Sequence, residues 1–382
     1  KKWLYENKNF QPEIKNSIGE WLEKGLEDWC ISRDGPYFGF QIPGETNKYF
    51  YVWLDAPIGY ISSTKHFTKG WETYWKKSGS TIHHFIGKDI IYFHFLFWPA
   101  MLMGAGFNVP NDITVHGFLT VNGKKMSKSR GTFFTAKEFL KLYNPEYLRF
   151  YYALHISKKL SDIDLNFEDF KATVNNKLVA NIANLCYRVL SFIEKNYGGK
   201  LATVAKEDIS KLEQQVERIK SFYHEQNIKG AISEILAISD AGNTYIQNLA
   251  PWKNQEKSKD QVAFAANIVR NISILLSPIL PLFSARIQEQ LGEKSLSFND
   301  ISFNKKISVT DARILLTKIE TIPSKPTFPL NIKVGKVLSV EDHPHADSLY
   351  DLNCDLGTAK RQIESGKKKI VSEQYSQKEN KY

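Results

Sequence analysis

The feature that most constrains the fold of this chain is a change in its hydrophobic pattern at about residue 137. Before that point, short runs rich in aromatic and β-branched residues alternate with longer apolar segments. We expect strands at 49–54, 81–86 and 113–116, and a buried helix at 90–103. After that point, apolar residues recur at helical spacing. Strands that alternate with helices favour an α/β unit with a parallel sheet, followed here by an all-α region.

Two apolar stripes and two breaks support the helical region. One stripe comprises Phe264, Ile268, Ile272, Leu275, Leu276 and Ile279, and the other comprises Ile228, Ile232, Ile235 and Ile238. Gly198-Gly199 and Ala250-Pro251 are expected between helices. We therefore predict a helical bundle at roughly 180–312. A connector containing prolines follows at 322–329, and alternating apolar residues at 332–340 predict a half-buried strand of a small β module.

Composition limits the class of protein. The 382 residues, 42% of them apolar and 24% charged, fit a folded protein of two or three domains. The longest apolar stretch, 95–107, contains Pro99 and is shorter than the roughly 20 residues of a spanning helix, so no membrane association is predicted. Three widely separated cysteines fit a reducing environment, and we expect a cytoplasmic protein. The net charge of +10 favours a polyanionic partner such as nucleic acid.

The strongest local motif is the loop from Gly123 to Gly131, with the sequence Gly-Lys-Lys-Met-Ser-Lys-Ser-Arg-Gly. Glycines permit close approach of the backbone, hydroxyls donate hydrogen bonds, and lysines supply positive charge to a phosphate group whose charge grows during a reaction. The loop is therefore a candidate phosphate-binding site. A solvated basic surface loop is the alternative for such a lysine cluster.

Five residues of this loop, Lys125-Met126-Ser127-Lys128-Ser129, are identical to the signature loop of class I aminoacyl-tRNA synthetases. Residues 53–60, residues 85–90, Phe93-His94 and His116-Gly117 narrow the resemblance to the methionyl-tRNA synthetases. The resemblance runs from about Trp3 into the bundle and resumes in the C-terminal module. It implies an α/β Rossmann-like partial catalytic domain, an all-α anticodon-binding bundle and a partial β-barrel (OB-fold) module.

The resemblance also implies a methionine-tRNA ligase, which uses ATP to convert L-methionine to methionyl-adenylate and transfers it to the 3′ end of tRNA(Met). Lys128 and Lys125 would be catalytic, with Lys128 stabilising the triphosphate as methionine attacks the α-phosphorus and pyrophosphate leaves. Mg²⁺ would share this role. The implied ATP-binding residues are Gly87, Lys88, Asp89, Lys128 and Ser129. A helix N-cap is an alternative or additional role for Asp89.

The implied methionine pocket comprises Trp53, Ala56, Pro57, Tyr60, Ile90 and His94. Aromatic walls suit a long, polarisable side chain through contacts with its sulfur, and one polar group near the sulfur can reject plain aliphatic side chains. Without the resemblance, these aromatic residues would more often be core, and His94 would be a hydrogen-bonded core histidine. Arg33 lies in a segment that resembles one near the family's active site, with a surface ion pair as its alternative.

For anticodon recognition, the resemblance points to Asn184, Arg188 and Trp252. Asn184 and Arg188 lie four residues apart on one predicted helix face, and Trp252 lies at a helix end. Such residues suit base-edge hydrogen bonds and stacking on the unpaired bases of a CAU anticodon. A buried interhelical bond is the alternative for Asn184, and packing alone is the alternative for Trp252.

The C-terminal module resembles an oligonucleotide-binding-fold tRNA-binding domain, in which Lys367 and Lys368 would contact phosphates. His343 and His345 flank a proline with no third ligand nearby, so no metal site is predicted in this chain. The expected partners are tRNA(Met), L-methionine and a second copy of the chain bound through this module.

The expected domains follow from these assignments. They are residues 1–50 (end of a connective insert), 51–118 (second half of the catalytic domain), 119–180 (stem-contact region with the signature loop), 181–312 (anticodon-binding bundle), 313–330 (linker) and 331–382 (partial OB-fold). The His-x-Gly-His signature of class I enzymes is not found. We therefore expect a C-terminal fragment that is deficient in adenylate formation on its own, with zinc bound only in the missing N-terminal part. The alternatives are a non-catalytic tRNA-binding protein and a class I synthetase for another amino acid.

Overall fold

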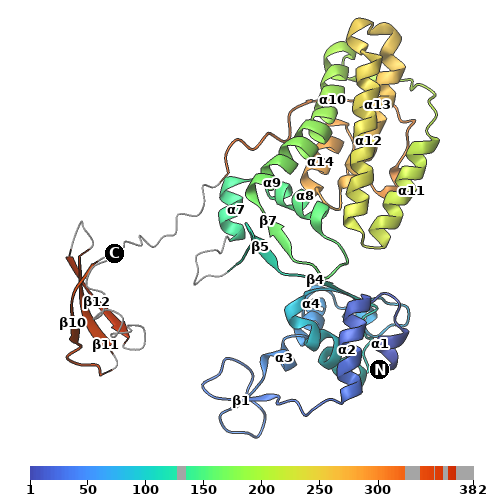
Figure 1. Ribbon diagram of the computed structural model, residues 1–382. Helices are drawn as coiled ribbons and strands as arrows, with labels where there is room; N and C mark the ends of the chain where they lie inside the picture. Colours follow the sequence, from blue (N-terminus) through green and yellow to red (C-terminus); the bar gives the residue numbers. More distant parts are fainter. Residues whose placement is uncertain (127–134, 323–335, 348, 356–359, 367–382) are drawn as a thin grey trace. The chain divides into compact units, whose positions relative to one another are not determined.

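The computed structural model describes residues 1–126, 135–322, 336–347, 349–355 and 360–366 (Figure 1). The chain divides into two compact units, Lys1–Pro323 and Ser324–Tyr382, and each is described by itself. Among the described helices, none combines the length and apolar character that crossing a bilayer requires.

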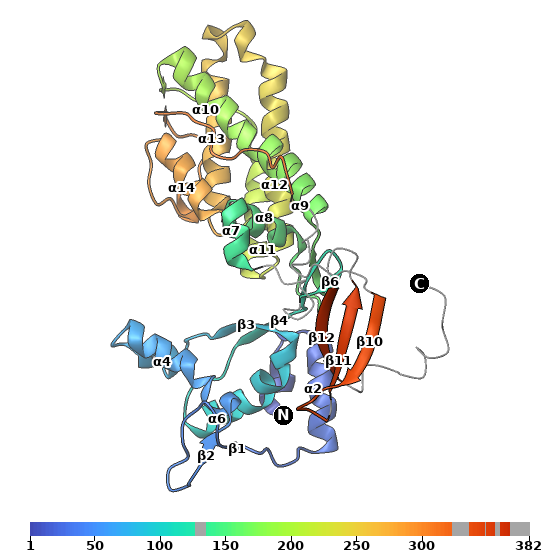
Figure 2. The ribbon, with the colours of Figure 1, turned by 90° about the vertical axis from the view of Figure 1, so that its left-hand side faces the viewer.

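The N-terminal region of the first unit, residues 1–118, is built from short elements. Its helical segments are α1 (Lys2–Glu6), α2 (Pro12–Lys24), α3 (Val52–Asp55), α4 (Ile58–Phe67), α5 (Trp71–Trp75), η1 (Lys88–Ile90), η2 (Phe93–Phe97) and α6 (Trp98–Gly104). Strands β1 (Ser32–Asp34) and β2 (Lys48–Phe50) pair antiparallel, whereas β3 (His83–Gly87) and β4 (Asp112–His116) pair parallel and lie side by side in Figure 2. The predicted strands at 81–86 and 113–116 and the helical segment between them are therefore confirmed.

The strand predicted at 49–54 is wrong beyond Phe50. The backbone turns into α3 after Tyr51, and the Ala56 amide donates to the Val52 carbonyl at 2.8 Å. β1 pairs only with residues 48–50, and the Trp53 ring stacks on Phe93 of η2 instead of extending the sheet. Strand propensity is set by such side-chain packing, and here the packing partner belongs to a helix.

β4 lies in a small core that includes a buried glutamine. Ile113 and Val115 of β4 are fully buried beside Leu4 and Ile14. The Gln11 side chain accepts a hydrogen bond from the Val115 amide at 2.7 Å and donates one to the Val115 carbonyl at 3.0 Å. The Gln11 side chain therefore pairs with both backbone hydrogen-bonding groups of Val115, as a neighbouring strand would.

A second sheet carries the signature loop. β5 (Leu119–Val121) pairs antiparallel with β6 (Lys124–Lys125) and parallel with β7 (Ile163–Leu165). Asn122 and Gly123 join β5 to β6 with φ values of 48° and 73°, the left-handed conformation that two-residue hairpin turns require. β7 was not predicted, because three residues with a half-buried aspartate at their centre give too little pattern.

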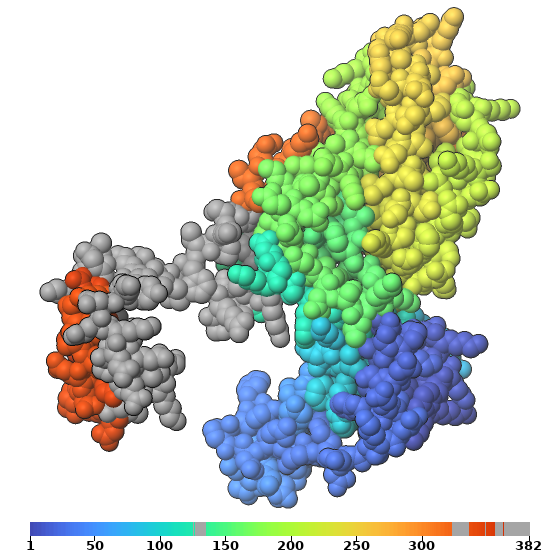
Figure 3. Space-filling model, in the orientation of Figure 1, coloured from blue at the N-terminus to red at the C-terminus, as the bar shows by residue number. Residues whose placement is uncertain are grey.

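The rest of the first unit is helical. Its helical segments are α7 (Ala136–Leu142), α8 (Pro145–His155), α9 (Phe167–Thr173), η3 (Val174–Ala183), α10 (Asn184–Tyr197), α11 (Ser210–His224), α12 (Ile228–Leu249), η4 (Pro251–Lys253), η5 (Glu256–Ser258), α13 (Lys259–Leu276), α14 (Pro281–Gln290) and η6 (Phe298–Asp300). The short strands β8 (Lys200–Leu201) and β9 (Ile307–Ser308) pair antiparallel. One apolar cluster runs through this region, and its helices form a continuous surface in green and yellow (Figure 3).

The two apolar stripes behave differently. On α12, Ile232, Ile235 and Ile238 are buried as predicted. On α13, the predicted stripe is also buried, but burial is not confined to it, because every residue from Val262 to Leu276 is buried. α13 packs against α10, α12 and α14, and a helix surrounded by other helices buries its whole circumference. The predicted breaks are confirmed, since Gly198 and Ala250 adopt left-handed backbone after α10 and α12.

Residues 313–322 return along α8 and η3. The Tyr147 hydroxyl donates to the Thr317 carbonyl at 2.7 Å, and the Asn175 side chain exchanges two hydrogen bonds with the Ile319 backbone. Leu316 and Ile319 are buried. The packed part of the first unit thus continues into the segment predicted as a linker.

The second unit contains an antiparallel sheet of β10 (Lys336–Asp342), β11 (Leu349–Asp355) and β12 (Lys360–Gly366). The predicted strand is confirmed from Lys336 onward, whereas residues 332–335 lie outside the described residues. A register shift between Val337 and Ser339 leaves Leu338 and Val340 half exposed. The described strands form an open sheet, so the predicted barrel is not seen in the part of the chain that the structure describes.

Candidate functional site

The turn that follows β3 lies at the carboxyl edge of the parallel sheet. Gly87 is paired in register with His116 of β4, so both strands end at this edge, where α/β sheets bind ligands. A Cβ atom on Gly87 would lie 2.5 Å from Asp89 Oδ1, so the carboxylate folds back over the glycine. Asp89 is exposed, and no side chain caps η1. The helix-cap alternative for Asp89 is therefore wrong, and the carboxylate faces solvent at this edge.

Lys88 turns from this edge toward the second sheet. Its Nζ lies 2.6 Å from Asp162 Oδ1 and 4.3 Å from the centre of the Phe118 ring. In this structure the Lys88 ammonium therefore forms an ion pair with the residue that precedes β7, and its contact with ATP stays a prediction.

A polar pair lies within an aromatic cluster behind the turn. The Tyr60 hydroxyl lies 3.0 Å from His94 Nε2, and His94 Nδ1 lies 3.1 Å from the Ile90 carbonyl oxygen. Because a carbonyl can only accept, Nδ1 carries the proton of the neutral ring, and Nε2 accepts the hydrogen bond from Tyr60. Burial lowers the pKa of His94 and raises the pKa of Tyr60, so both groups remain uncharged at neutral pH.

A second histidine supports the first. Trp98 Nε1 donates to His84 Nε2 at 3.1 Å, and the His84 ring centre lies 4.8 Å from Tyr60 and 5.6 Å from His94. Burial, with a smaller effect of His94, lowers the pKa of His84 to about 4. The sequence reasoning did not identify His84 or Trp98, although Trp98 follows His94 by four residues on an apolar helix, a spacing that places both on one face.

The remaining predicted pocket residues lie around this cluster. Trp53 stacks on Phe93 at 4.4 Å and meets His94 edge-on at 6.1 Å. Ala56 and Pro57 join α3 to α4, between Trp53 and Tyr60, whereas the Ile90 side chain packs against the Leu4 core. The structure therefore brings Trp53, Tyr60 and His94 into one cluster.

Arg33 lies over an aromatic ring. Its guanidinium carbon is 3.8 Å from the centre of the Tyr51 ring, and Tyr51 in turn lies 6.4 Å from Phe93. Nη1 donates to the Cys30 and Ser32 carbonyls. Arg33 thus adjoins the aromatic cluster through a cation–π contact rather than through an ion pair.

The base of the signature loop is held by a carboxylate. Asp164 Oδ1 accepts hydrogen bonds from the Thr120 hydroxyl at 2.6 Å and the Gly123 amide at 2.8 Å. The backbone of Lys125 belongs to β6, which leads into the loop. Lys128 and Ser129, predicted to contact ATP, lie outside the described residues.

In the bundle, a cavity of about 260 Å³ brings Arg188 of α10 together with Trp252 of η4. Trp252 is 49% exposed, so its ring is available for stacking. Asn184 is exposed one helical turn before Arg188, so the buried interhelical alternative is wrong for this residue. Asn181 makes the interhelical bonds instead, to Ser239, Asp240 and Asn243. Lys367 and Lys368 lie outside the described residues.

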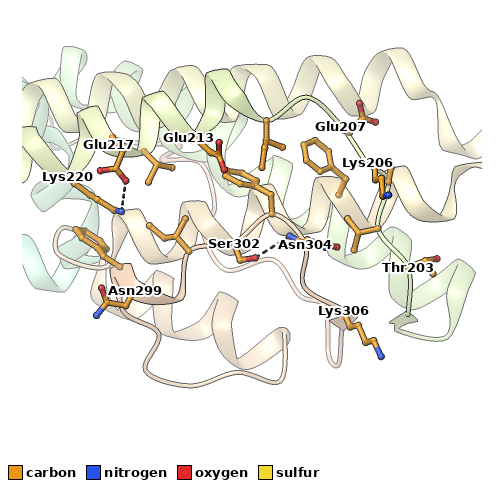
Figure 4. Close-up of a pocket in the computed structure, with 18 of the residues that line it drawn as sticks. Thr203, Lys206, Glu207, Glu213, Glu217, Lys220, Asn299, Ser302, Asn304 and Lys306 are labelled. Atoms are coloured by element: carbon orange, nitrogen blue, oxygen red, sulfur yellow. Dashed lines mark hydrogen bonds and ion pairs between the residues drawn. The ribbon is translucent and has the colours of Figure 1, made fainter.

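A larger cavity, of about 1210 Å³, lies between residues 202–209, α11 and residues 298–306 (Figure 4). Glu213 and Glu217 line one wall, and Lys306 lies on another. It contains none of the predicted site residues. Within the described residues, no group of three or more histidine, cysteine, aspartate or glutamate side chains is placed to hold a metal ion.

Comparisons with known proteins agree on one family. Residues 1–190 match the family model for class I tRNA synthetases (M), residues 196–321 match the anticodon binding domain of methionyl tRNA ligase, and residues 332–381 match a putative tRNA binding domain. Two solved structures of Mycobacterium tuberculosis methionyl-tRNA synthetase with methionyl-adenylate are similar, with TM-scores of 0.73 and 0.71 at 25% and 26% identity. They are matched over 82% of this chain and over 65% and 64% of their own length, so the chain spans just under two thirds of each.

Proposed function

The chain belongs to the methionyl-tRNA synthetase family of class I aminoacyl-tRNA synthetases, and we propose that it serves methionine-tRNA ligation. In the first step, a carboxylate oxygen of L-methionine attacks the α-phosphorus of ATP and pyrophosphate leaves. In the second, a hydroxyl at the 3′ end of tRNA(Met) attacks the activated carbonyl and AMP leaves. A cytoplasmic location is part of this proposal.

The observation that carries the proposal is the neutral Tyr60–His94 pair within aromatic walls. Trp53 and Phe93 offer polarisable faces for a thioether, and the Tyr60–His94 hydrogen bond holds one polar group in a defined position. An aliphatic side chain of the same length would bind with less favourable free energy, because it would displace water from the Tyr60–His94 pair without offering that pair a polar partner. This arrangement therefore favours methionine over an isosteric hydrocarbon.

The ribose of the nucleotide is proposed to bind the exposed Asp89 carboxylate. Gly87, which has no side chain, lets the nucleotide approach the backbone closely. Lys125, Lys128 and Ser129 remain the proposed phosphate-binding residues. Mg²⁺ is bound in such sites through one or two carboxylates together with substrate phosphates, so the absence of a larger acidic cluster among the described side chains is compatible with it. When bound with ATP, the ion would neutralise phosphate charge.

Methionine binding can be tested without turnover, by tryptophan fluorescence, because Trp53 and Trp98 lie in the cluster. We expect saturable binding of L-methionine, weaker binding of norleucine, and roughly fivefold weaker methionine binding in Tyr60→Phe, since one hydrogen bond contributes about 1 kcal/mol. The matched control is Tyr74→Phe, an exposed tyrosine of α5. Equal effects of the two substitutions would contradict the pocket assignment.

Anticodon recognition is proposed for Asn184, Arg188 and Trp252. Stacking on one base contributes about 1–3 kcal/mol, so Trp252→Ala should weaken binding of tRNA(Met) roughly 5- to 150-fold in a filter-binding assay. Trp21→Ala, at an exposed tryptophan of α2, is the control. A changed anticodon should weaken binding to the native chain, because the base-edge hydrogen bonds proposed for Asn184 and Arg188 depend on base identity. If tRNA binds in this way but methionine does not, the chain is a non-catalytic tRNA-binding protein.

A homodimer through the C-terminal module is also proposed. The half-exposed Leu338 and Val340 on β10, which is an edge strand of the described sheet, support it. Light scattering should give twice the chain mass, and Leu338→Lys should restore the monomer mass. A native chain that is monomeric at all concentrations would contradict the dimer.

A further inference from the structure

The Lys88 side chain connects two parts of the candidate active site. It starts from the turn after β3, where the nucleotide is proposed to bind, and ends between Asp162 and Phe118. Asp162 immediately precedes β7, and Phe118 immediately precedes β5. One side chain therefore spans from the first sheet to the starts of two paired strands, β5 and β7, of the sheet that carries the signature loop.

The segments that receive Lys88 are tightly joined. Asp162 Oδ1 accepts both the Lys88 ammonium, at 2.6 Å, and the Phe118 amide, at 2.8 Å. The Ile163 amide donates to the Phe118 carbonyl at 2.9 Å. A Cβ atom on Gly117 would lie 2.2 Å from the Ser161 carbonyl oxygen, so only glycine permits this approach. A displacement of the ammonium would therefore be transmitted to both strands.

A second carboxylate of the same strand continues the connection toward the loop. Asp162 and Asp164 are two residues apart, so the strand period places them on one side of β7. Asp164 fixes the Asn122-Gly123 turn through its bonds to Thr120 and Gly123. The two carboxylates thus fix the start of β5 and the turn before β6, whose last residue, Lys125, opens the signature sequence.

We infer that Lys88 is a positioning residue. Its ion pair with Asp162 sets the distance between the turn after β3 (residues 87–89), where the nucleotide is proposed to bind, and the start of the signature loop at residues 122–125. The inference rests on the proposed function, because the spacing matters only if ATP bridges the two. A misplacement of about 1 Å between reacting groups can cost a hundredfold in rate, so a fixed spacer has a kinetic consequence without touching the substrate.

The test is a charge exchange, read out by methionine-dependent ATP–pyrophosphate exchange. Lys88→Met and Asp162→Asn should each lower kcat roughly tenfold or more and leave KM for ATP within about twofold. Lys88→Asp combined with Asp162→Lys should recover much of kcat. If Lys88 contacts ATP directly, Lys88→Met should instead raise KM for ATP, and the double variant should not recover activity. That result overturns the inference. Lys48→Met, which removes the exposed ion pair with Asp34, is the matched control.

Amide hydrogen exchange provides a readout that does not need activity. In the unliganded chain, both single substitutions should speed amide hydrogen exchange at Gly123, and the double variant Lys88→Asp with Asp162→Lys should slow it again there. The Phe118 amide does not serve for this comparison, because Asp162→Lys removes the carboxylate that accepts its hydrogen bond. Unchanged protection in Lys88→Met overturns the inference whether or not the chain is active. A native chain that shows the expected change in protection but binds neither L-methionine nor ATP would instead contradict the proposed function and leave the ion pair as a structural spacer.

Discussion

The N-terminal region and the helical bundle differ in how their buried residues are organised. The bundle has one apolar cluster that extends from Phe139 to Ile319, with α13 at its centre. The N-terminal region has two small apolar clusters and buries His84, His94 and Asp112 beside them. Apolar burial stabilises without specifying chemistry, whereas buried polar groups cost free energy unless they are paired. The bundle also buries polar groups, such as Arg270 paired with Glu293, but within one continuous core. In the N-terminal region the buried His84 and His94 instead belong to the candidate site.

The largest expected effect is the loss of an aromatic side chain from the large apolar cluster that the bundle shares with α7, α8 and α9. Phe170 is fully buried and lies against Phe139, Tyr143 and Tyr151 at ring distances of 5.5–5.6 Å. Phe170→Ala should lower the free energy of unfolding by about 3–5 kcal/mol, because it removes apolar contacts and leaves a cavity. Urea unfolding followed by circular dichroism measures the change. In contrast, Phe38→Ala, at an exposed residue of the N-terminal region, should stay within about 0.5 kcal/mol, and a similar loss in both variants would break the comparison.

The N-terminal region should be the more sensitive of the two to acid. The folded chain lowers the pKa of His84 from 6.5 to about 4, whereas the unfolded chain takes up the proton near pH 6.5. The unfolded state therefore binds more protons between these values. The stability due to the neutral ring is complete above about pH 6.5 and is lost as pH falls toward 4, by about 3 kcal/mol in all.

This pH dependence can be assigned by substitution. Unfolding followed by tryptophan fluorescence, which includes Trp98 beside His84, should show the loss in the native chain and much less of it in His84→Gln. His66→Gln, at an exposed histidine of α4, is the control and should retain the full dependence. Identical pH profiles for all three chains would show that the buried imidazole does not set the acid sensitivity.

A smaller effect is expected where the two regions meet. Gln226, in the turn between α11 and α12, donates to Asp112 Oδ2 at 2.8 Å and accepts from the Thr114 hydroxyl at 2.7 Å. Its φ of 60° is unfavourable for a residue with a side chain, which is a sign that these contacts hold it in place. Gln226→Ala should reduce the coupling between the regions by about 1–2 kcal/mol.

Calorimetry measures this coupling, because uncoupled regions unfold in two transitions rather than one. Gln226→Gly removes the same bonds but relieves the backbone, so it separates the two causes. Both variants should split the transition if the side-chain bonds carry the coupling. A single, more stable transition in Gln226→Gly would show that relief of backbone strain outweighs the loss of the side-chain bonds.

The smallest expected effect concerns helix capping. α9, which leads into the bundle, is capped by Asn166, whose side chain accepts from the amides of Glu168 and Asp169. In the N-terminal region, α3, α4 and α5 have no side-chain cap bond. Asn166→Ala should cost about 1 kcal/mol in urea unfolding, while Asn166→Asp keeps the acceptor and should cost much less. Equal losses in the two variants would show that the Asn166 side chain does not stabilise α9 by capping it.

Local patterns predicted the parts of the fold that depend on neighbours along the chain. The β3 and β4 strands, the buried face of α12 and the left-handed break at Gly198 follow from hydrophobic period and turn chemistry, which are properties of short segments. The family motif likewise pointed to Trp53, Tyr60 and His94. Tertiary packing overrode these patterns at residues 52–55, where Trp53 stacks on a helix, and on α13, where neighbouring helices cover every face.

The sequence by itself determined the family, the order of the regions and the chemical types at the site. Only the tertiary structure decided which groups pair: His84 with Trp98, Gln226 with Asp112, and Lys88 with Asp162, 74 residues away. Spacing along a chain reports which residues share a face. Spacing does not report which distant residues that face contacts, because those contacts depend on how the strands and helices are arranged in space.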